Sequence, residues 1–107
     1  MIPFRKMNGL GNDFVVVDAR RKPRELTPAR IAGLADRRSG IGFDQFITIA
    51  PARENGHHAR MRIVNADGGE VESCGNAARC VAALLLDETG LQKVDIESDG
   101  GLMTAWR

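Results

Sequence analysis

The sequence has little net charge, little cysteine and no long apolar run. Fifteen Lys and Arg residues against fourteen Asp and Glu leave a formal charge of +1. No strong basic field is therefore present to attract nucleic acid or an anionic membrane. Every apolar run falls short of the roughly 18 residues that a membrane-spanning helix needs. We expect neither a nucleic-acid partner nor a membrane partner.

Cysteine is also too scarce for a disulfide framework, because only Cys74 and Cys80 are present. The first residues lack the basic-then-apolar order of a signal peptide. Both observations predict a cytoplasmic protein with reduced thiols. The two cysteines and the adjacent His57-His58 pair do not match the usual spacing of zinc ligands, and we expect the histidines to be solvated.

The length of 107 residues, with 43% apolar and 27% charged residues, is typical of one globular domain over residues 1–107. Short apolar runs separated by turns predict about seven strands and two helices. The expected strands are residues 2–7, 14–18, 45–50, 59–65, 70–72, 94–98 and 102–106.

The two predicted helices differ in character. Thr27-Pro28 is a typical helix start, and the apolar residues that follow lie on one side, which indicates a short surface helix. The second helix, Gly75–Thr89, has apolar residues on nearly every side, which predicts burial all round. Because hairpins join most strands, we predict an α+β fold with a mainly antiparallel, strongly curved sheet (a half-barrel) wrapped around this central helix.

Cys74 comes directly before the second predicted helix. A thiol at that position faces unpaired backbone N–H groups and the positive end of the helix dipole, which lowers a cysteine pKa. The same N–H groups could hold a carboxylate, with Gly75 keeping the approach open and Asn76 offering an amide. The alternative is that Cys74 is only a small residue at a helix cap. We expect Cys80 to be a buried small apolar residue.

Four side-chain amides lie at predicted strand or helix ends: Asn12, Gln45, Asn65 and Asn76. Amides donate and accept hydrogen bonds without adding charge, which suits the carboxylate and ammonium groups of an amino acid. The alternative for Asn12 and Asn65 is that each side chain serves its own turn.

Three segments together resemble the diaminopimelate epimerase family: Met7–Phe14, Gly40–Gln45 and Asn65–Cys80. They occur in the family's order and spacing, and the similarity covers essentially the whole chain. The resemblance implies a domain with a sheet around a central helix, corresponding to the N-terminal half of a two-domain isomerase.

The implied activity converts LL-2,6-diaminopimelate to its meso form, a step of lysine and peptidoglycan precursor synthesis, without a metal or any other cofactor. By motif position, Cys74 matches one of the family's two acid/base cysteines. The implied substrate-binding positions are Asn12, Gln45, Asn65, Gly75 and Asn76.

The chain departs from this family in length, since family members are more than twice as long and carry their second reactive cysteine in the other half. We therefore predict that the 107-residue chain alone is inactive. The resemblance also implies that this half of the fold normally receives an edge strand from the extreme C-terminus of the family's longer chain. The sheet edge left open without that strand predicts a homo-oligomer formed by strand pairing. Three alternatives stay open: a related racemase of the proline racemase type, a non-catalytic amino-acid-binding domain and a purely structural module.

Overall fold

The fold combines one sheet with two helices, and the computed structural model describes residues 4–9, 12–21, 27–36, 38, 40–71 and 75–106. The predicted seven strands and two helices are all present in this part of the chain. In chain order the elements are β1 (Arg5–Gly9), β2 (Asn12–Asp18), α1 (Pro28–Ala35), β3 (Gln45–Ala50), β4 (Ala59–Asn65), β5 (Glu70–Val71), α2 (Gly75–Thr89), β6 (Lys93–Ser98) and β7 (Gly101–Trp106).

The sheet is mixed, with strand order β1-β2-β3-β4-β6-β7 and with β5 paired to β4. The expectation of a mainly antiparallel sheet is wrong, because β2 and β3 are parallel, as are β4 and β6. Both parallel pairs have a physical reason. A helix lies between the two strands in the chain, α1 in the first pair and α2 in the second, and a helix brings the chain back to start the next strand in the same direction.

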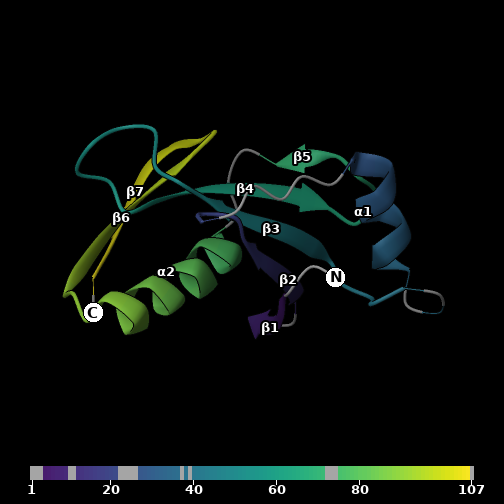
Figure 1. Cartoon of the computed structure of the whole chain (residues 1–107). Coiled ribbons are helices and arrows are strands. Elements are labelled where there is room, and N and C mark those ends of the chain that lie inside the picture. Colours follow the sequence, from purple (N-terminus) through teal and green to yellow (C-terminus); the bar gives the residue numbers. More distant parts are fainter. Residues whose placement is uncertain are drawn as a thin grey trace.

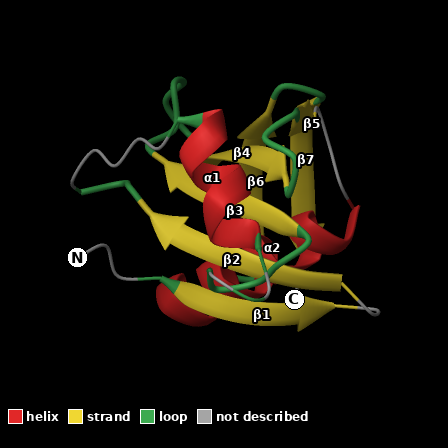
Figure 2. Cartoon of the chain, turned by 90° about the vertical axis from the view of Figure 1, so that its right-hand side faces the viewer, coloured by secondary structure: helices red, strands yellow, loops and turns green. Residues whose placement is uncertain are grey.

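The two helices lie on opposite faces of the sheet, as Figures 1 and 2 show from two sides. Successive side chains of a strand point to opposite faces, and β2 displays this alternation. Phe14 and Val16 belong to the core on the α2 side, whereas Val15 and Val17 belong to the core beneath α1. The sheet is therefore buried on both faces where β2 and β3 run.

Helix α2 is buried on one side only, which corrects the prediction of burial all round. Val81 and Leu85 are almost fully buried, whereas Arg79, Ala83 and Asp87 are exposed. The cause is that the sheet does not close: β1 and β7 end the strand order on opposite sides of α2 and do not pair with each other in the described chain. Cys80 is half-buried and packs against the core, in part as expected.

Helix α1 is a surface helix, as predicted. The hydroxyl of Thr27 accepts a hydrogen bond from the backbone N–H of Arg30, 3.2 Å away, and caps the helix. Ile31 is buried while Arg30 is exposed. The chain then turns back tightly at Gly40, where a Cβ atom would lie 2.5 Å from the carbonyl oxygen of Leu34. Glycine is therefore required at this position.

Membrane insertion by a helix is not indicated within the described ranges, since none of their helices combines the length and the apolar character of a membrane span.

Candidate functional site

Three of the predicted amide positions lie at the same end of the sheet. Asn12 is the first residue of β2, Gln45 is the first residue of β3, and Asn65 is the last residue of β4. Since β2 and β3 are parallel, they start together, with Phe14 opposite Gln45. Strand β4 is antiparallel to β3, so its last residue lies opposite the first residue of β3.

The side chains of Gln45 and Asn65 contact each other. The Nε2 atom of Gln45 donates a hydrogen bond to Oδ1 of Asn65 over 3.1 Å, and both side chains are partly buried. This bond sets the orientation of the Asn65 amide, because its oxygen faces Gln45 and its NH₂ group therefore faces away. The pair presents an ordered amide surface at the sheet end.

The turn after β4 does not use the Asn65 side chain. It is closed by backbone bonds, with the N–H of Asn65 donating to Gly69 O and the N–H of Gly68 donating to Asn65 O. The carboxylate of Asp67 accepts the N–H of Gly69 over 2.8 Å. The Asn65 side chain is thus directed to Gln45 rather than to its own turn, and the turn-only alternative is wrong for this residue.

Helix α2 begins close to this end of the sheet. Val71 of β5 pairs with Ile63, two residues before the end of β4. Gly75 is four positions after Val71 in the sequence, so the Cα atoms of these two residues lie at most about 14 Å apart. Gly75 and Asn76 are the first two residues of α2.

Part of the predicted site lies outside the described residues. This applies to all of Cys74 and to the side chains of Asn12 and Asn76. The roles predicted for these three residues therefore remain predictions. Within the described part of the chain, the side chains of the predicted amide cluster that contact each other are those of Gln45 and Asn65.

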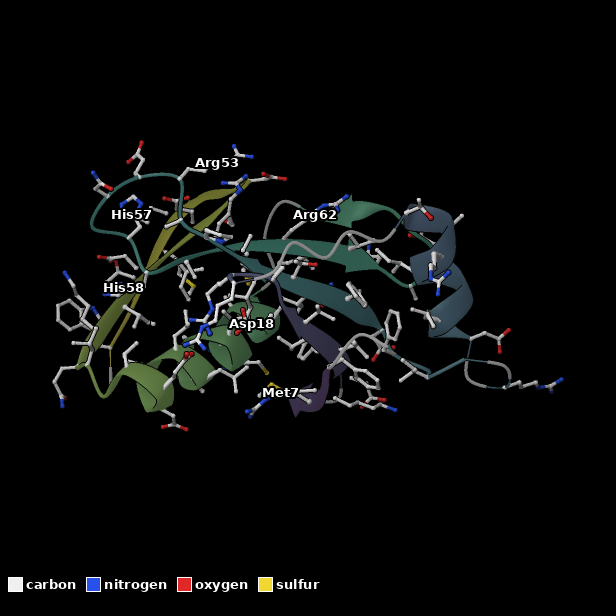
Figure 3. All side chains as sticks on the ribbon, viewed as in Figure 1. Met7, Asp18, Arg53, His57, His58 and Arg62 are labelled. Carbon is white, nitrogen blue, oxygen red and sulfur yellow. The ribbon has the colours of Figure 1, made fainter. Side chains whose placement is uncertain are left out.

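The two histidines form a separate cluster at the other end of β4, as Figure 3 shows. Glu97 Oε2 lies 2.6 Å from Nδ1 of His57, and the ring of His58 accepts the backbone N–H of Asp95. Both rings are thus engaged with β6 and partly buried, which corrects the expectation that they are solvated. Strand β4 separates His58 from Asn65 by about 20 Å, so the histidines do not belong to the amide cluster.

The carboxylate of Glu97 organises this second cluster. It accepts the backbone N–H groups of Arg53 and Glu54 at 2.8 and 3.1 Å in addition to its contact with His57. The bond from Arg53 and the His57 contact lower the pKa of Glu97 to about 2. The cluster anchors the loop between β3 and β4 to β6, which is a structural role.

A groove of about 620 Å³ lies against the C-terminal half of α2. Val16, Asp18, Arg20, Ile49, Leu84 and Glu88 are among its lining residues. None of the predicted site residues lines it. Three of the charged residues that line the groove are paired with one another, because Arg20 bonds to both Asp18 and Glu88 over 2.7 Å.

Metal binding is not indicated by the residues that have a described position. Among them no three His, Cys, Asp or Glu side chains gather as a metal site requires.

Two residues at the sheet end that carries the predicted amides were not predicted from the sequence. Asp13 and Asp44 directly precede Phe14 and Gln45, and they bond to each other twice. Both residues lie beside predicted amides, Asp13 within Met7–Phe14 and Asp44 within Gly40–Gln45, and this position is the signal that could have identified them.

The chain is similar to known proteins along nearly all of its length. The family model described as "Diaminopimelate epimerase" matches residues 4–106. A diaminopimelate epimerase of Acidiphilium cryptum is 55% identical over 103 residues, which are 96% of this chain and 36% of that protein. One of Sphingopyxis alaskensis is 62% identical over 82 residues, 77% of this chain and 30% of that protein. The chain thus spans little more than a third of its curated relatives.

Solved structures show the same fold at low sequence identity. A phenazine biosynthesis protein of the PhzF family from Enterococcus faecalis superimposes with a TM-score of 0.68 at 15% identity, covering 99% of this chain and 40% of that chain. Methylitaconate-delta-isomerase superimposes with a TM-score of 0.72 at 16% identity, covering 96% of this chain and 33% of that chain.

Proposed function

The chain belongs to the diaminopimelate epimerase family, and from this we propose that it forms half of an active site that epimerises LL-2,6-diaminopimelate to the meso form. The observation that carries the proposal is the ordered amide pair of Gln45 and Asn65. It lies at the sheet end where β2 starts with Asn12 and near the start of α2.

These groups suit an α-amino acid for a chemical reason. Amide oxygens accept the N–H groups of an ammonium, and amide NH₂ groups donate to a carboxylate. The first backbone N–H groups of a helix add partial positive charge for the same carboxylate. In the proposed arrangement Asn12, Gln45, Asn65 and Asn76 hold the substrate, and the N–H groups at Gly75 and Asn76 stabilise its negative charge.

The proposed role of Cys74 is acid/base chemistry at the α-carbon. As a thiolate it removes the α-hydrogen as a proton and becomes a thiol, while the electron pair of the broken C–H bond spreads into the carboxylate. A thiol on the opposite face then donates a proton to the α-carbon, which inverts its configuration. Cys74 precedes a helix N-terminus, which favours a thiolate. The reaction as proposed needs no cofactor.

The second thiol does not come from Cys80 in this proposal. Cys80 is half-buried against the core and lies five residues into α2. We propose that the partner cysteine comes from the part of the family's length that this chain does not span. The 107-residue chain alone should then be inactive.

The test measures exchange of the α-hydrogen of LL-diaminopimelate in heavy water together with formation of the meso isomer. It compares the chain alone with the chain combined with the remaining part of a relative. We expect inversion only in the combination, with Cys74→Ala reducing it at least about a thousandfold and the control Cys80→Ala retaining it. Inversion by the chain alone would contradict the need for a second half.

The alternatives predict other outcomes of the same test. A non-catalytic amino-acid-binding domain would bind diaminopimelate without exchange of the α-hydrogen. A racemase of the proline type would invert proline and leave diaminopimelate unchanged. A structural module would bind neither amino acid.

Self-association is a second proposal, for which the sheet edge is the support. In the described chain β7 pairs with β6 on one side only, and its side chains Leu102 and Trp106 are 55% and 71% exposed. An edge strand with exposed apolar residues pairs readily with another strand. We propose that two copies of the isolated chain associate through β7.

A further inference from the structure

Asp44 makes hydrogen bonds to two of the segments that carry the amide residues. Its backbone N–H donates to Asp13 O over 3.0 Å, and its Oδ2 atom accepts the backbone N–H of Asp13 over 2.8 Å. Its carbonyl oxygen accepts the N–H of Ala66 over 3.0 Å. Asp44 itself belongs to the third segment, because it directly precedes Gln45.

Both Asp13 and Ala66 are chain neighbours of a predicted amide. Asp13 follows Asn12 at the start of β2, and Ala66 follows Asn65 at the end of β4. The three bonds therefore fix the spacing of the three strand ends on which Asn12, Gln45 and Asn65 lie. The hydrogen bond between Gln45 and Asn65, at 3.1 Å, requires that spacing.

The hydrogen bond that the Asp44 side chain accepts differs from that of an ordinary turn residue. The bond from Asp13 to Asp44 spans 31 residues of sequence and is partly buried, so it joins two strands rather than closing a local turn. A hydrogen bond to an ionised carboxylate is about twice as strong as one to a neutral group. The Asp44 carboxylate thus holds the start of β2 against the start of β3.

We propose that Asp44 is a positioning residue of the amide site, which holds Asn12, Gln45 and Asn65 at the distances that the substrate needs. The inference rests on the proposed function, since the substrate is the one proposed above. Displacements near 1 Å at substrate-positioning groups reduce rates by as much as a hundredfold. Asp44 acts through its neighbours and does not itself touch the reacting atoms in this proposal.

The test uses Asp44→Ala, which removes the acceptor, and Asp44→Asn, which keeps an oxygen that can accept the N–H of Asp13. The matched control is Asp18→Asn. Asp18 lies at the other end of β2 and also accepts a backbone N–H, that of Arg20. Without substrate, hydrogen exchange of the Asp13 amide and the NMR signals of the Gln45 and Asn65 side-chain NH₂ groups are measured in the 107-residue chain.

We expect Asp44→Ala to raise exchange of the Asp13 amide at least about tenfold and to move both NH₂ signals. Asp44→Asn should restore most of the difference, and Asp18→Asn should leave the signals in place. Unchanged NH₂ signals in a folded Asp44→Ala chain would overturn the proposal. If Asp44→Ala fails to fold, Asp44→Asn decides alone. Its amide oxygen accepts the N–H of Asp13 less strongly than a carboxylate does, so exchange of the Asp13 amide should rise and both NH₂ signals should move by a small amount. Exchange and NH₂ signals identical to those of the unmodified chain would then overturn the proposal.

The link to function is measured in the chain combined with the remaining part of a relative. For Asp44→Ala we expect KM for LL-diaminopimelate to rise about tenfold, with a partial return in Asp44→Asn. An unchanged KM beside displaced NH₂ signals would overturn the positioning role. If the unmodified combination does not turn over diaminopimelate at all, the proposed function fails, while the NMR comparison still decides whether Asp44 orders the amides.

Discussion

The carboxylate of Glu97 meets the ring of His57 at 2.6 Å between Oε2 and Nδ1. Glu97 is 8% exposed and is the one buried charged residue recorded among the described residues. A buried carboxylate is costly unless it is paired and hydrogen-bonded. Glu97 meets that condition through two backbone N–H groups of the loop between β3 and β4 in addition to His57.

The stability of the fold should therefore depend on pH in the acid range. The bonds from Arg53 and His57 lower the pKa of Glu97 from its ordinary 4.5 to about 2. A group whose pKa is lowered on folding stabilises the native state above its unfolded pKa. This contribution should be complete above about pH 4.5 and should disappear as the pH falls toward 2.

The variant Glu97→Gln tests this directly. We expect this variant to have a lower midpoint of thermal unfolding than the unmodified chain at pH 7. The two midpoints should converge near pH 2, where Glu97 is itself protonated. The matched control is Glu54→Gln, which changes an exposed carboxylate of the same loop. Equal pH dependence of stability in Glu97→Gln and the unmodified chain between pH 4.5 and 2 would contradict the assignment.

Two glycines, Gly33 inside α1 and Gly40 five residues after its last residue, should respond in opposite directions to substitution by alanine. A Cβ at Gly33 meets nothing within 4 Å, and the residue lies inside α1, so Gly33→Ala should stabilise by about 0.5–1 kcal/mol. A Cβ at Gly40 would lie 2.5 Å from a backbone oxygen. Gly40→Ala should therefore destabilise by about 1–3 kcal/mol.

Urea denaturation of both variants measures these changes. Each serves as the control for the other, because the substitution is the same and only the surroundings differ. A stabilising Gly40→Ala would mean that the segment before β3 can shift without cost, which would weaken the explanation given for its close approach to Leu34.

The sequence predicts most elements because their signals are local. The bounds of β3, β4 and α2 are as predicted, and Thr27 caps α1 as expected. Each of these rests on residues within one segment: alternating side chains in β4, an apolar stretch with a following Gly90 in α2, and a hydroxyl before Pro28 in α1.

Strand direction was predicted wrongly because it depends on long-range pairing. Hairpins between neighbouring strands do occur, as in β3 with β4. The two parallel pairs instead join strands that lie on either side of a helix. The order strand-helix-strand favours such pairing, but the prediction was based on the hairpins between neighbouring strands. The exposure of one side of α2 was likewise not predictable from the residues of the helix, since it depends on whether the sheet closes around the helix.

The amide site shows the same division. Residue type and position at strand ends point to Gln45 and Asn65, and the structure brings them into contact. Asp44 was not predicted, because its importance comes from a bond to a residue 31 positions away. A pattern within one segment does not contain such a contact.

Arg20 should couple β2 to α2 in a way that salt weakens. Its guanidinium bonds to both oxygens of Asp18 and to Glu88 of α2, and it holds the pKa of Asp18 below its ordinary value. Asp18 and Glu88 are about half exposed, so the interaction is screened by solvent. A double-mutant cycle of Arg20→Met and Glu88→Gln should give a coupling free energy of about 0.5 kcal/mol at low salt.

The same cycle at about 1 M salt should give a smaller coupling free energy, because exposed charges are screened over about 3 Å at that ionic strength. The free energies of unfolding for both cycles are measured by urea denaturation. The control is a cycle of Arg20 with Glu54, a residue of the loop between β3 and β4. Glu54 has no ion pair with Arg20 among the described contacts. A coupling that is equal at both salt concentrations would contradict an electrostatic origin.

The β7 edge should govern self-association of the isolated chain. Leu102 is an exposed apolar residue of this strand, and a charge placed on an edge strand opposes pairing with another strand. We expect the average mass from sedimentation equilibrium to rise with concentration for the unmodified chain, and Leu102→Lys to weaken association at least about tenfold.

The control Leu91→Lys places the same charge at an exposed leucine between α2 and β6, outside any strand, and should leave association unchanged. Equal weakening by both substitutions would mean that net charge rather than the β7 edge sets the association, and a monomer at every concentration would exclude the proposed pairing.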